Sequence, residues 1–336
     1  MKLQKYYIGV DVSKETLDIA LMEEGQFVSG TSIGNNPKEI KKLFSSWVKE
    51  FGCNLGQTLV CMEHTGVYCW PLLVYLQQTP CKVCLENAYR IKHSNGLQRG
   101  KNDRVDAERI ALYAWRNKGL LQEWKAPKRN IKRLKQLMTM RKGLVNAKKK
   151  LLVPIKETGK FIDRNMAKEL EKSCCRSIRV LELDIMAIEE RILGIVRSDN
   201  DLGRMFDILV SIDGIGKITA IMFLTTTNAF TSSREAKKYA CYAGVVPFEH
   251  SSGKSIRGKT KLSHFANKEM KTVLHLCALT LCNSKGELGV YYRRKVAEGK
   301  NKMSVLNALR NKIVLRVFAC IKENKLYEKN YQNKVA

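Results

Sequence analysis

The sequence predicts an α/β domain at the N-terminus, a long helical hairpin in the middle and a mostly α-helical domain at the C-terminus. Two observations support this division. Apolar runs of strand length alternate with helical patterns up to about residue 120. Beyond about residue 128, apolar residues recur every three or four positions and strand patterns vanish. We therefore expect domains at 1–120 and 201–322, a coiled-coil linker or dimerisation region at 121–200, and a polar tail at 323–336.

Within the N-terminal region, the patterns predict strands and helices in mixed order. Strands are expected at 6–12, 16–22, 26–31, 58–62 and 82–86, and helices at 37–51, 67–78 and 103–116. Such a mixture indicates helices packed on a central sheet.

Two apolar stripes predict the helical hairpin. They comprise Leu134, Leu137, Met138, Arg141, Leu144, Lys148 and Leu151, and, after a break between Pro154 and Gly159, Leu181, Ile185, Ile188, Ile192 and Ile195. The spacing suits a coiled coil between subunits and an intramolecular helix pair equally well. From about residue 203, short helices and Gly-rich turns are expected.

The charge balance points to a polyanionic partner. Lys and Arg number 60 against 32 Asp and Glu, which gives a formal net charge of +28. Nucleic acid fits this excess best, and the plainer alternative is a basic protein with solvated lysine faces. No apolar run is long enough to span a bilayer, and no membrane partner is expected. The 11 cysteines are scattered, many of them inside apolar runs, as expected for reduced thiols in a cytoplasmic protein.

Four carboxylates occupy positions that suit a metal site. Asp11 and Glu63 each end an apolar strand, and Asp103 and Asp106 lie three residues apart at the start of a helix. Asp103 is equally explained as a helix N-cap. Mg²⁺ prefers oxygen ligands, and two ions about 4 Å apart stabilise both oxygens of a phosphoryl transfer.

The opening strand pair, with Asp11 on its first strand, is common to two kinds of enzyme core. One is the ribonuclease-H-like metal nuclease and the other is the actin-like ATPase. The ATPase requires glycine-rich phosphate loops after later strands, and the chain has too few glycines there.

Two segments of the C-terminal half are candidates for phosphate binding. Gly214, Gly216 and Lys217 lie in a pattern that resembles a helix–hairpin–helix, whose free N–H groups bind phosphate; an ordinary turn between helices explains it too. Further on, a small basic loop surrounds two serines with cations, namely Lys254, Arg257, Lys259 and Lys261. No Ser–His–Asp pattern accompanies these serines.

Several of these segments together resemble the IS110 family of insertion-sequence transposases. The resembling segments of the N-terminal half are Gly9–Lys14, Met62–Tyr68 and Lys101–Ala107, and those of the C-terminal half are the Gly-Ile-Gly turn, Tyr242–Pro247 and Ser252-Gly253. Their order and spacing agree over nearly the whole chain. Asn102 and His64 depart from residues common in that family, but neither is one of the four acids.

The resemblance implies an N-terminal fold like that of the Holliday-junction resolvase RuvC. Asp11, Glu63, Asp103 and Asp106 would be its acidic tetrad and would hold Mg²⁺, with two ions per site and Mn²⁺ as a substitute. Ser252 would attack DNA and form a covalent phosphoserine intermediate, with its neighbour Ser251 as the alternative.

The resemblance also implies partners and a setting. A structured bridge RNA would guide the protein by pairing with target and donor DNA, and homodimers would assemble into tetramers in a prokaryotic cytoplasm, at the nucleoid when acting. The expected function is RNA-guided DNA transposition or recombination. The alternatives are a RuvC-like junction nuclease that uses water and a non-catalytic nucleic-acid-binding protein.

Overall fold

The protein is described by a computed structural model that covers residues 4–94, 103–159, 161–232, 235–252, 256–261, 263 and 265–329. It divides into two compact units, Met1–Ala126 and Pro127–Ala336, and each is described by itself. The first is α/β and the second is mostly helical, which confirms the predicted fold class.

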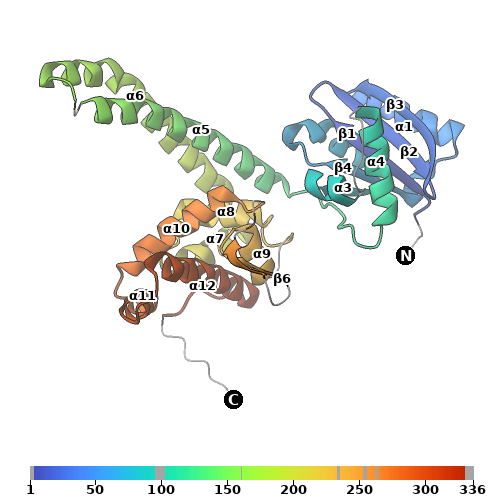
Figure 1. The fold of residues 1–336 in the computed structure, drawn as a ribbon. Helices are drawn as coiled ribbons and strands as arrows, with labels where there is room; N and C mark the ends of the chain where they lie inside the picture. The colour runs from blue at the N-terminus through green and yellow to red at the C-terminus, as the bar shows by residue number, and fades with distance from the viewer. Residues whose placement is uncertain are drawn as a thin grey trace. The chain divides into compact units, whose positions relative to one another are not determined.

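The first unit is built on a five-stranded sheet (Figure 1). Its strands are β1 (Tyr6–Val12), β2 (Thr16–Glu23), β3 (Gln26–Gly34), β4 (Thr58–Glu63) and β5 (Lys82–Glu86), in the order β3-β2-β1-β4-β5. The first three strands are antiparallel neighbours, and β4 and β5 run parallel to β1. This order and these directions are those of the ribonuclease-H-like fold.

Helices cover both faces of this sheet. On one face, α1 (Pro37–Glu50) and α2 (Trp70–Leu76) bury Phe44, Trp47 and Leu72 against the strands. On the other, α4 (Asp103–Arg116) packs its small residues Ala107, Ala111 and Ala114 on the sheet (Figure 1). A short helix that the sequence pattern did not predict, α3 (Ala88–Ser94), follows β5.

The close fit of α4 on the sheet depends on one glycine. A Cβ atom built on Gly9 of β1 would lie 2.1 Å from the carbonyl oxygen of Ala107 and 2.2 Å from the amide nitrogen of Ala111. No side chain fits at this crossing, so glycine lets the helix backbone approach the strand.

The second unit begins with the predicted helical hairpin. Its arms are α5 (Arg129–Thr158) and α6 (Arg164–Arg197), joined across by ion pairs Arg141–Glu189 and Lys148–Glu182 at 2.6 Å each. The break between the two helices was predicted between Pro154 and Gly159, but α5 continues through Pro154 and ends at Thr158. Proline removes one backbone donor, and here it lies in the final turns of the helix.

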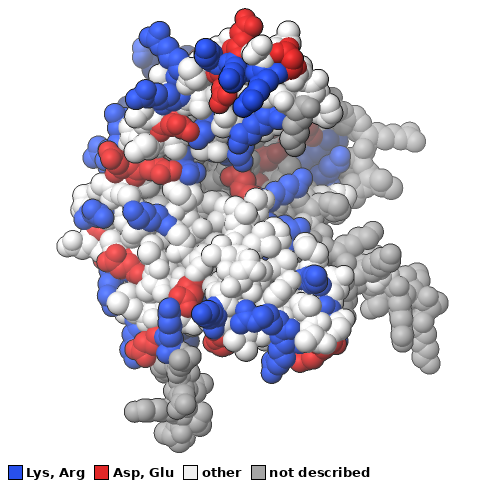
Figure 2. Space-filling model, turned by 90° about the vertical axis from the view of Figure 1, so that its left-hand side faces the viewer, with Lys and Arg blue, Asp and Glu red and all other residues white. Residues whose placement is uncertain are grey.

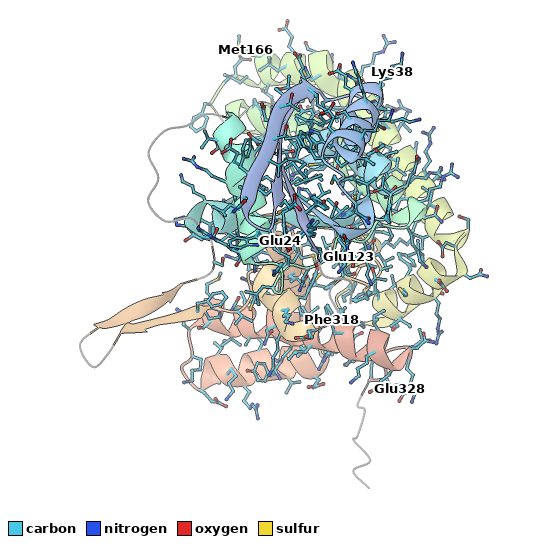
Figure 3. All side chains as sticks on the ribbon, turned by 90° about the vertical axis from the view of Figure 1, so that its right-hand side faces the viewer. Glu24, Lys38, Glu123, Met166, Phe318 and Glu328 are labelled. Carbon is cyan, nitrogen blue, oxygen red and sulfur yellow. The ribbon has the colours of Figure 1, made fainter. Side chains whose placement is uncertain are left out.

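The remaining helices form one core around the base of that hairpin. They are α7 (Asn200–Ser211), α8 (Lys217–Thr226), α9 (Ala236–Tyr242), α10 (Lys268–Cys282), α11 (Glu287–Ala297) and α12 (Lys302–Glu323). On α12, Phe318, labelled in Figure 3, packs its ring against Phe230 and Tyr239. Short helices were expected here; α9 has 7 residues, whereas α12 is longer than expected at 22.

The basic serine segment was predicted as a loop, and this is wrong for its backbone. Strands β6 (Phe248–Ser252) and β7 (Ile256–Lys261) pair in antiparallel fashion. Ladder hydrogen bonds between the two strands set this structure, although the segment lacks the apolar alternation by which strands are recognised in sequence. In Figure 3 this hairpin extends away from the helices of its unit.

Candidate active site

Three carboxylates line the ends of three neighbouring parallel strands. Asp11 is the last residue but one of β1, and Glu63 and Glu86 end β4 and β5. Glu63 lies beside Glu86 in register, and Asp11 lies one residue past the last pair between β1 and β4. Because side chains alternate between faces along a strand, all three share the sheet face covered by α4, as Gly9 does.

The start of α4 lies toward this row of acids. Its middle crosses β1 at Gly9, and its end reaches the turn between β2 and β3, where Trp115 contacts Gly25. That turn sits beside the beginning of β1, because the amide of Glu24 (labelled in Figure 3) donates to the carbonyl of Lys5 at 3.0 Å. Helix α4 therefore runs antiparallel to β1, and its first turn points to the Asp11 end.

Asp103 and Asp106 both belong to that first turn. Asp103 is the first residue of α4, and its side chain lies outside the described part of the structure. Asp106 is half-buried and pairs with Nη1 of Arg109 at 2.8 Å. Among the described residues, no three Cys, His, Asp or Glu side chains form a group able to hold a metal ion. The backbone thus directs the four predicted acids toward one edge of the sheet, and their grouping around a metal stays a prediction.

Glu86 is an acid that the sequence reasoning missed. Its side chain is 12% exposed, and it accepts a hydrogen bond from the Tyr113 hydroxyl of α4 at 2.8 Å. Burial, and then this carboxylate, raise the pKa of Tyr113. The sequence did contain a pattern that could have identified it. Val83-Cys84-Leu85-Glu86, three apolar residues followed by a glutamate, repeats Val60-Cys61-Met62-Glu63.

This donor set suits a hard divalent cation. The strand-end ligands are carboxylate oxygens, which Mg²⁺ and Mn²⁺ prefer. Asp11 and Glu63 are both half-buried on adjacent strands, where neighbouring negative charges repel unless a cation or a donor compensates them. A divalent cation beside Asp11 and Glu63 fits this arrangement.

The predicted phosphate-binding turn joins α7 to α8. Gly214 has φ +85°, and a Cβ there would lie 2.7 Å from Leu281, so two constraints select glycine. Gly216 caps α8 without a side-chain hydrogen bond, and both it and Lys217 are exposed. The first N–H groups of α8 are therefore not occupied by a capping side chain, as anion binding at a helix start requires.

Ser252 ends β6, where it pairs with Ile256, and Ser251 pairs with Arg257. Arg257 and Lys259 belong to β7. The side chains of both serines and both cations, and the whole of Lys254, lie outside the described residues.

Basic side chains concentrate on one arm of the helical hairpin. Helix α5 carries ten Lys and Arg against one acid, Glu157, whereas α6 carries seven against six acids. At the base, an open groove of about 500 Å³ lies between the arms, lined by Arg133, Gln136, Leu137, Met140, Arg191, Gly194, Ile195 and Ser198. Lys and Arg side chains are spread over the molecular face drawn in Figure 2. No helix among the described residues is long and apolar enough to cross a membrane.

Two family models match this chain in the expected order. A transposase model, the DEDD transposase of the IS110 type, matches residues 8–158. The model of the transposase IS116/IS110/IS902 family matches residues 206–293. The first match contains most of β1, with Asp11, and the whole of β4 and α4, and the second contains the α7–α8 turn and the β6–β7 hairpin.

Known proteins resemble the chain over its whole length or in part. The pilin gene-inverting proteins of Moraxella bovis and Moraxella lacunata are each 25% identical over 97% of this chain and 99% of theirs. A 43.6 kDa protein of insertion element IS110 from Streptomyces coelicolor is 32% identical over 36% of this chain and 30% of its own. Among solved structures, T. thermophilus RuvC in complex with a Holliday junction substrate aligns at 14% identity and a TM-score of 0.28, over 36% of this chain and all of that one. By its two family models, this chain belongs to the IS110 family of transposases.

Proposed function

We propose that this transposase is an RNA-guided DNA recombinase that cuts and rejoins strands through a covalent phosphoserine intermediate. The observation that carries the proposal is the presence, in one chain and in family order, of a strand-end acid row and a serine hairpin on a strongly basic protein. The acids prepare a scissile phosphate, and the serine attacks it.

The acidic site comprises Asp11, Glu63, Asp103 and Asp106. A divalent cation bound there supplies positive charge that polarises the phosphate and stabilises the charge that develops on its oxygens. The strand-end positions of Asp11 and Glu63 keep their carboxylates at one edge of a rigid sheet, and α4 brings Asp103 and Asp106 toward that edge. Rigid placement matters, because phosphoryl transfer depends mostly on positioning and electrostatics.

Ser252 is the proposed nucleophile. Its Oγ forms a bond to phosphorus while the bond from phosphorus to one deoxyribose oxygen breaks, and that oxygen takes up the proton that the serine gives up. The phosphodiester is thereby conserved as a phosphoserine ester. Attack on phosphorus by a deoxyribose hydroxyl of another strand then breaks the bond to the serine Oγ, which takes up the hydroxyl's proton, and DNA is rejoined. Ser251, its neighbour in β6, is the alternative nucleophile.

Backbone contacts and base pairing divide the recognition of nucleic acid. The basic side chains of α5, the exposed start of α8 at Gly214, Gly216 and Lys217, and the cations Lys254, Arg257 and Lys259 are proposed to contact phosphates without reading sequence. A structured bridge RNA would select target and donor DNA by pairing, as in other guided systems. Homodimers that pair into tetramers would bring an acidic site and a serine to each exchanged strand.

Three substitutions test the proposal against its rivals. In a strand-exchange assay with guide RNA, donor and target DNA, we expect Ser252→Ala to abolish exchange and Ser251→Ala to retain it. Asp11→Asn should remove all strand cleavage. Cleavage at the wild-type rate by Ser252→Ala without any protein–DNA adduct would favour a nuclease that uses water, and full function of Asp11→Asn would favour a non-catalytic binding protein.

A further inference from the structure

A buried arginine in the second unit has no counter-charge among the residues that the structure describes. Arg310 of α12 is 5% exposed, and its neighbours along the helix, Leu309 and Ile313, are fully buried. Among the described residues, no carboxylate lies within ion-pair distance of Arg310, and its Nε has no hydrogen-bond partner. A buried unpaired charge is costly and does not by itself stabilise a fold, so its presence requires an explanation.

The other two guanidinium nitrogens of Arg310 hold two side chains. Nη1 donates to Oδ1 of Asn307 at 3.3 Å, and Nη2 lies 2.8 Å from Nδ1 of His275 on α10. Burial, then the charges of Arg310 and Lys271, lower the pKa of His275, which keeps its Nδ1 free to accept. With its Oδ1 facing the guanidinium, Asn307 turns its amide Nδ2 outward and donates to the carbonyl of Val245 at 2.8 Å.

Val245 belongs to the segment that leads into the serine hairpin. We call residues 242–247 and 265–267, which enter and leave the β6–β7 hairpin, the hairpin root. Within the root, the amide of Asn267 donates to the carbonyl of Tyr242 at 2.7 Å, and Nδ2 of Asn267 donates to the Tyr242 hydroxyl at 2.7 Å. Gly244, with φ +64°, leaves no room for a Cβ against Ala266.

The hairpin root is the part of the serine segment that the helices hold. The hairpin itself extends away from the helices in Figure 3, so a change of direction at the root is carried outward to Ser252, seven residues beyond Val245. Through the Asn307–Val245 hydrogen bond, α12 holds the segment by which the chain enters the hairpin.

We propose that Arg310 and Asn307 are positioning residues for Ser252, acting through the hydrogen bond from Asn307 to Val245 at the hairpin root. The proposal rests on the proposed function, because it assigns Ser252 as the group whose position matters. This role accounts for the buried guanidinium, because the guanidinium sets the orientation of the Asn307 amide. Stability alone does not account for it, because replacing a buried charge by an apolar side chain costs a fold little.

The substitution Asn307→Asp separates positioning from stability. An aspartate keeps an acceptor oxygen for Arg310 and adds the missing counter-charge, but it cannot donate to the carbonyl of Val245. The folded protein should unfold at the same or a higher temperature. Formation of the covalent DNA adduct should slow by about a hundredfold, the scale on which small misplacements of reacting groups act, while the Kd for donor DNA should stay within twofold of wild type.

Asn311→Asp is the matched control, since it makes the same change on the same helix at a half-buried position; it should leave adduct formation unchanged. A wild-type adduct rate in Asn307→Asp would overturn the positioning role. So would a loss of adduct that is matched by lower thermal stability or by weaker DNA binding, because the bond would then serve the fold or the affinity.

A parallel measurement on Ser252→Ala keeps the two proposals distinguishable. If Ser252→Ala and Ser251→Ala both still form the adduct, the proposed function fails. If Ser252→Ala forms it and Ser251→Ala does not, Ser251 is the nucleophile and the positioning role assigned toward Ser252 fails. If Ser252→Ala forms none and Asn307→Asp forms it at the wild-type rate, the positioning role alone fails.

Discussion

The substitution Gly9→Ala tests how closely α4 and the acid row are coupled. The added Cβ would lie 2.1 Å from the carbonyl oxygen of Ala107, whereas real Cβ atoms keep at least 3.0 Å. The helix must therefore move from β1 by about 1 Å, a strain that costs about 1–3 kcal/mol of stability in a packed interior. Because the obstructing atoms are backbone, no side-chain rotation relieves the contact.

This shift would separate the two halves of the proposed acidic site. Asp11 stays on β1, while Asp103 and Asp106 move with α4, and a displacement of about 1 Å costs about a hundredfold in rate. The assay is metal-dependent strand cleavage at saturating DNA, with urea unfolding measured in parallel. Gly119→Ala is the control, because its Cβ meets nothing within 4 Å. Wild-type stability and cleavage in Gly9→Ala would refute the close packing of α4 on β1 and its role in the site.

Three further outcomes are expected. Tyr113→Phe removes the hydroxyl that donates to Glu86 at 2.8 Å, and leaving this buried carboxylate short of a donor should cost about 1–3 kcal/mol in urea unfolding; unchanged stability would show that the bond contributes nothing. Replacing Lys149 and Lys150 of α5 by alanine should lower the slope of log Kd against log salt by about 0.9 for each lysine that contacts a duplex phosphate; an unchanged slope would remove α5 from the binding surface. Chelation with EDTA should abolish cleavage, and added Mg²⁺ or Mn²⁺ should restore it; cleavage that persists in EDTA would contradict a role for metal.

Local patterns were enough to predict most of the first unit. Strands are recognised by short apolar runs, and Asp11 and Glu63 stand out because a charge at the end of such a run needs a partner. Glu86 has the same pattern and was overlooked, although its register beside Glu63 follows once β4 and β5 are placed side by side.

The features that sequence could not provide depend on tertiary packing. Arg310 lies in a helix with several other basic residues, and nothing in its spacing distinguishes a buried arginine from a solvated one. The pairing of β6 with β7 likewise depends on backbone hydrogen bonds between strands rather than on an apolar pattern. Side-chain burial and strand pairing of this kind are decided by the whole fold, which is why both appear only in the structure.

The most direct test of the central claim is to identify the residue that carries DNA during the reaction. Wild-type protein, guide RNA and donor DNA are quenched in mid-reaction, the DNA is digested, and the peptides are sequenced by mass spectrometry. We predict a nucleotide attached to Ser252, and no adduct when Asp11 is replaced by Asn. Strand cleavage without any protein-linked nucleotide, or with the nucleotide on a residue outside the β6–β7 hairpin, would contradict it.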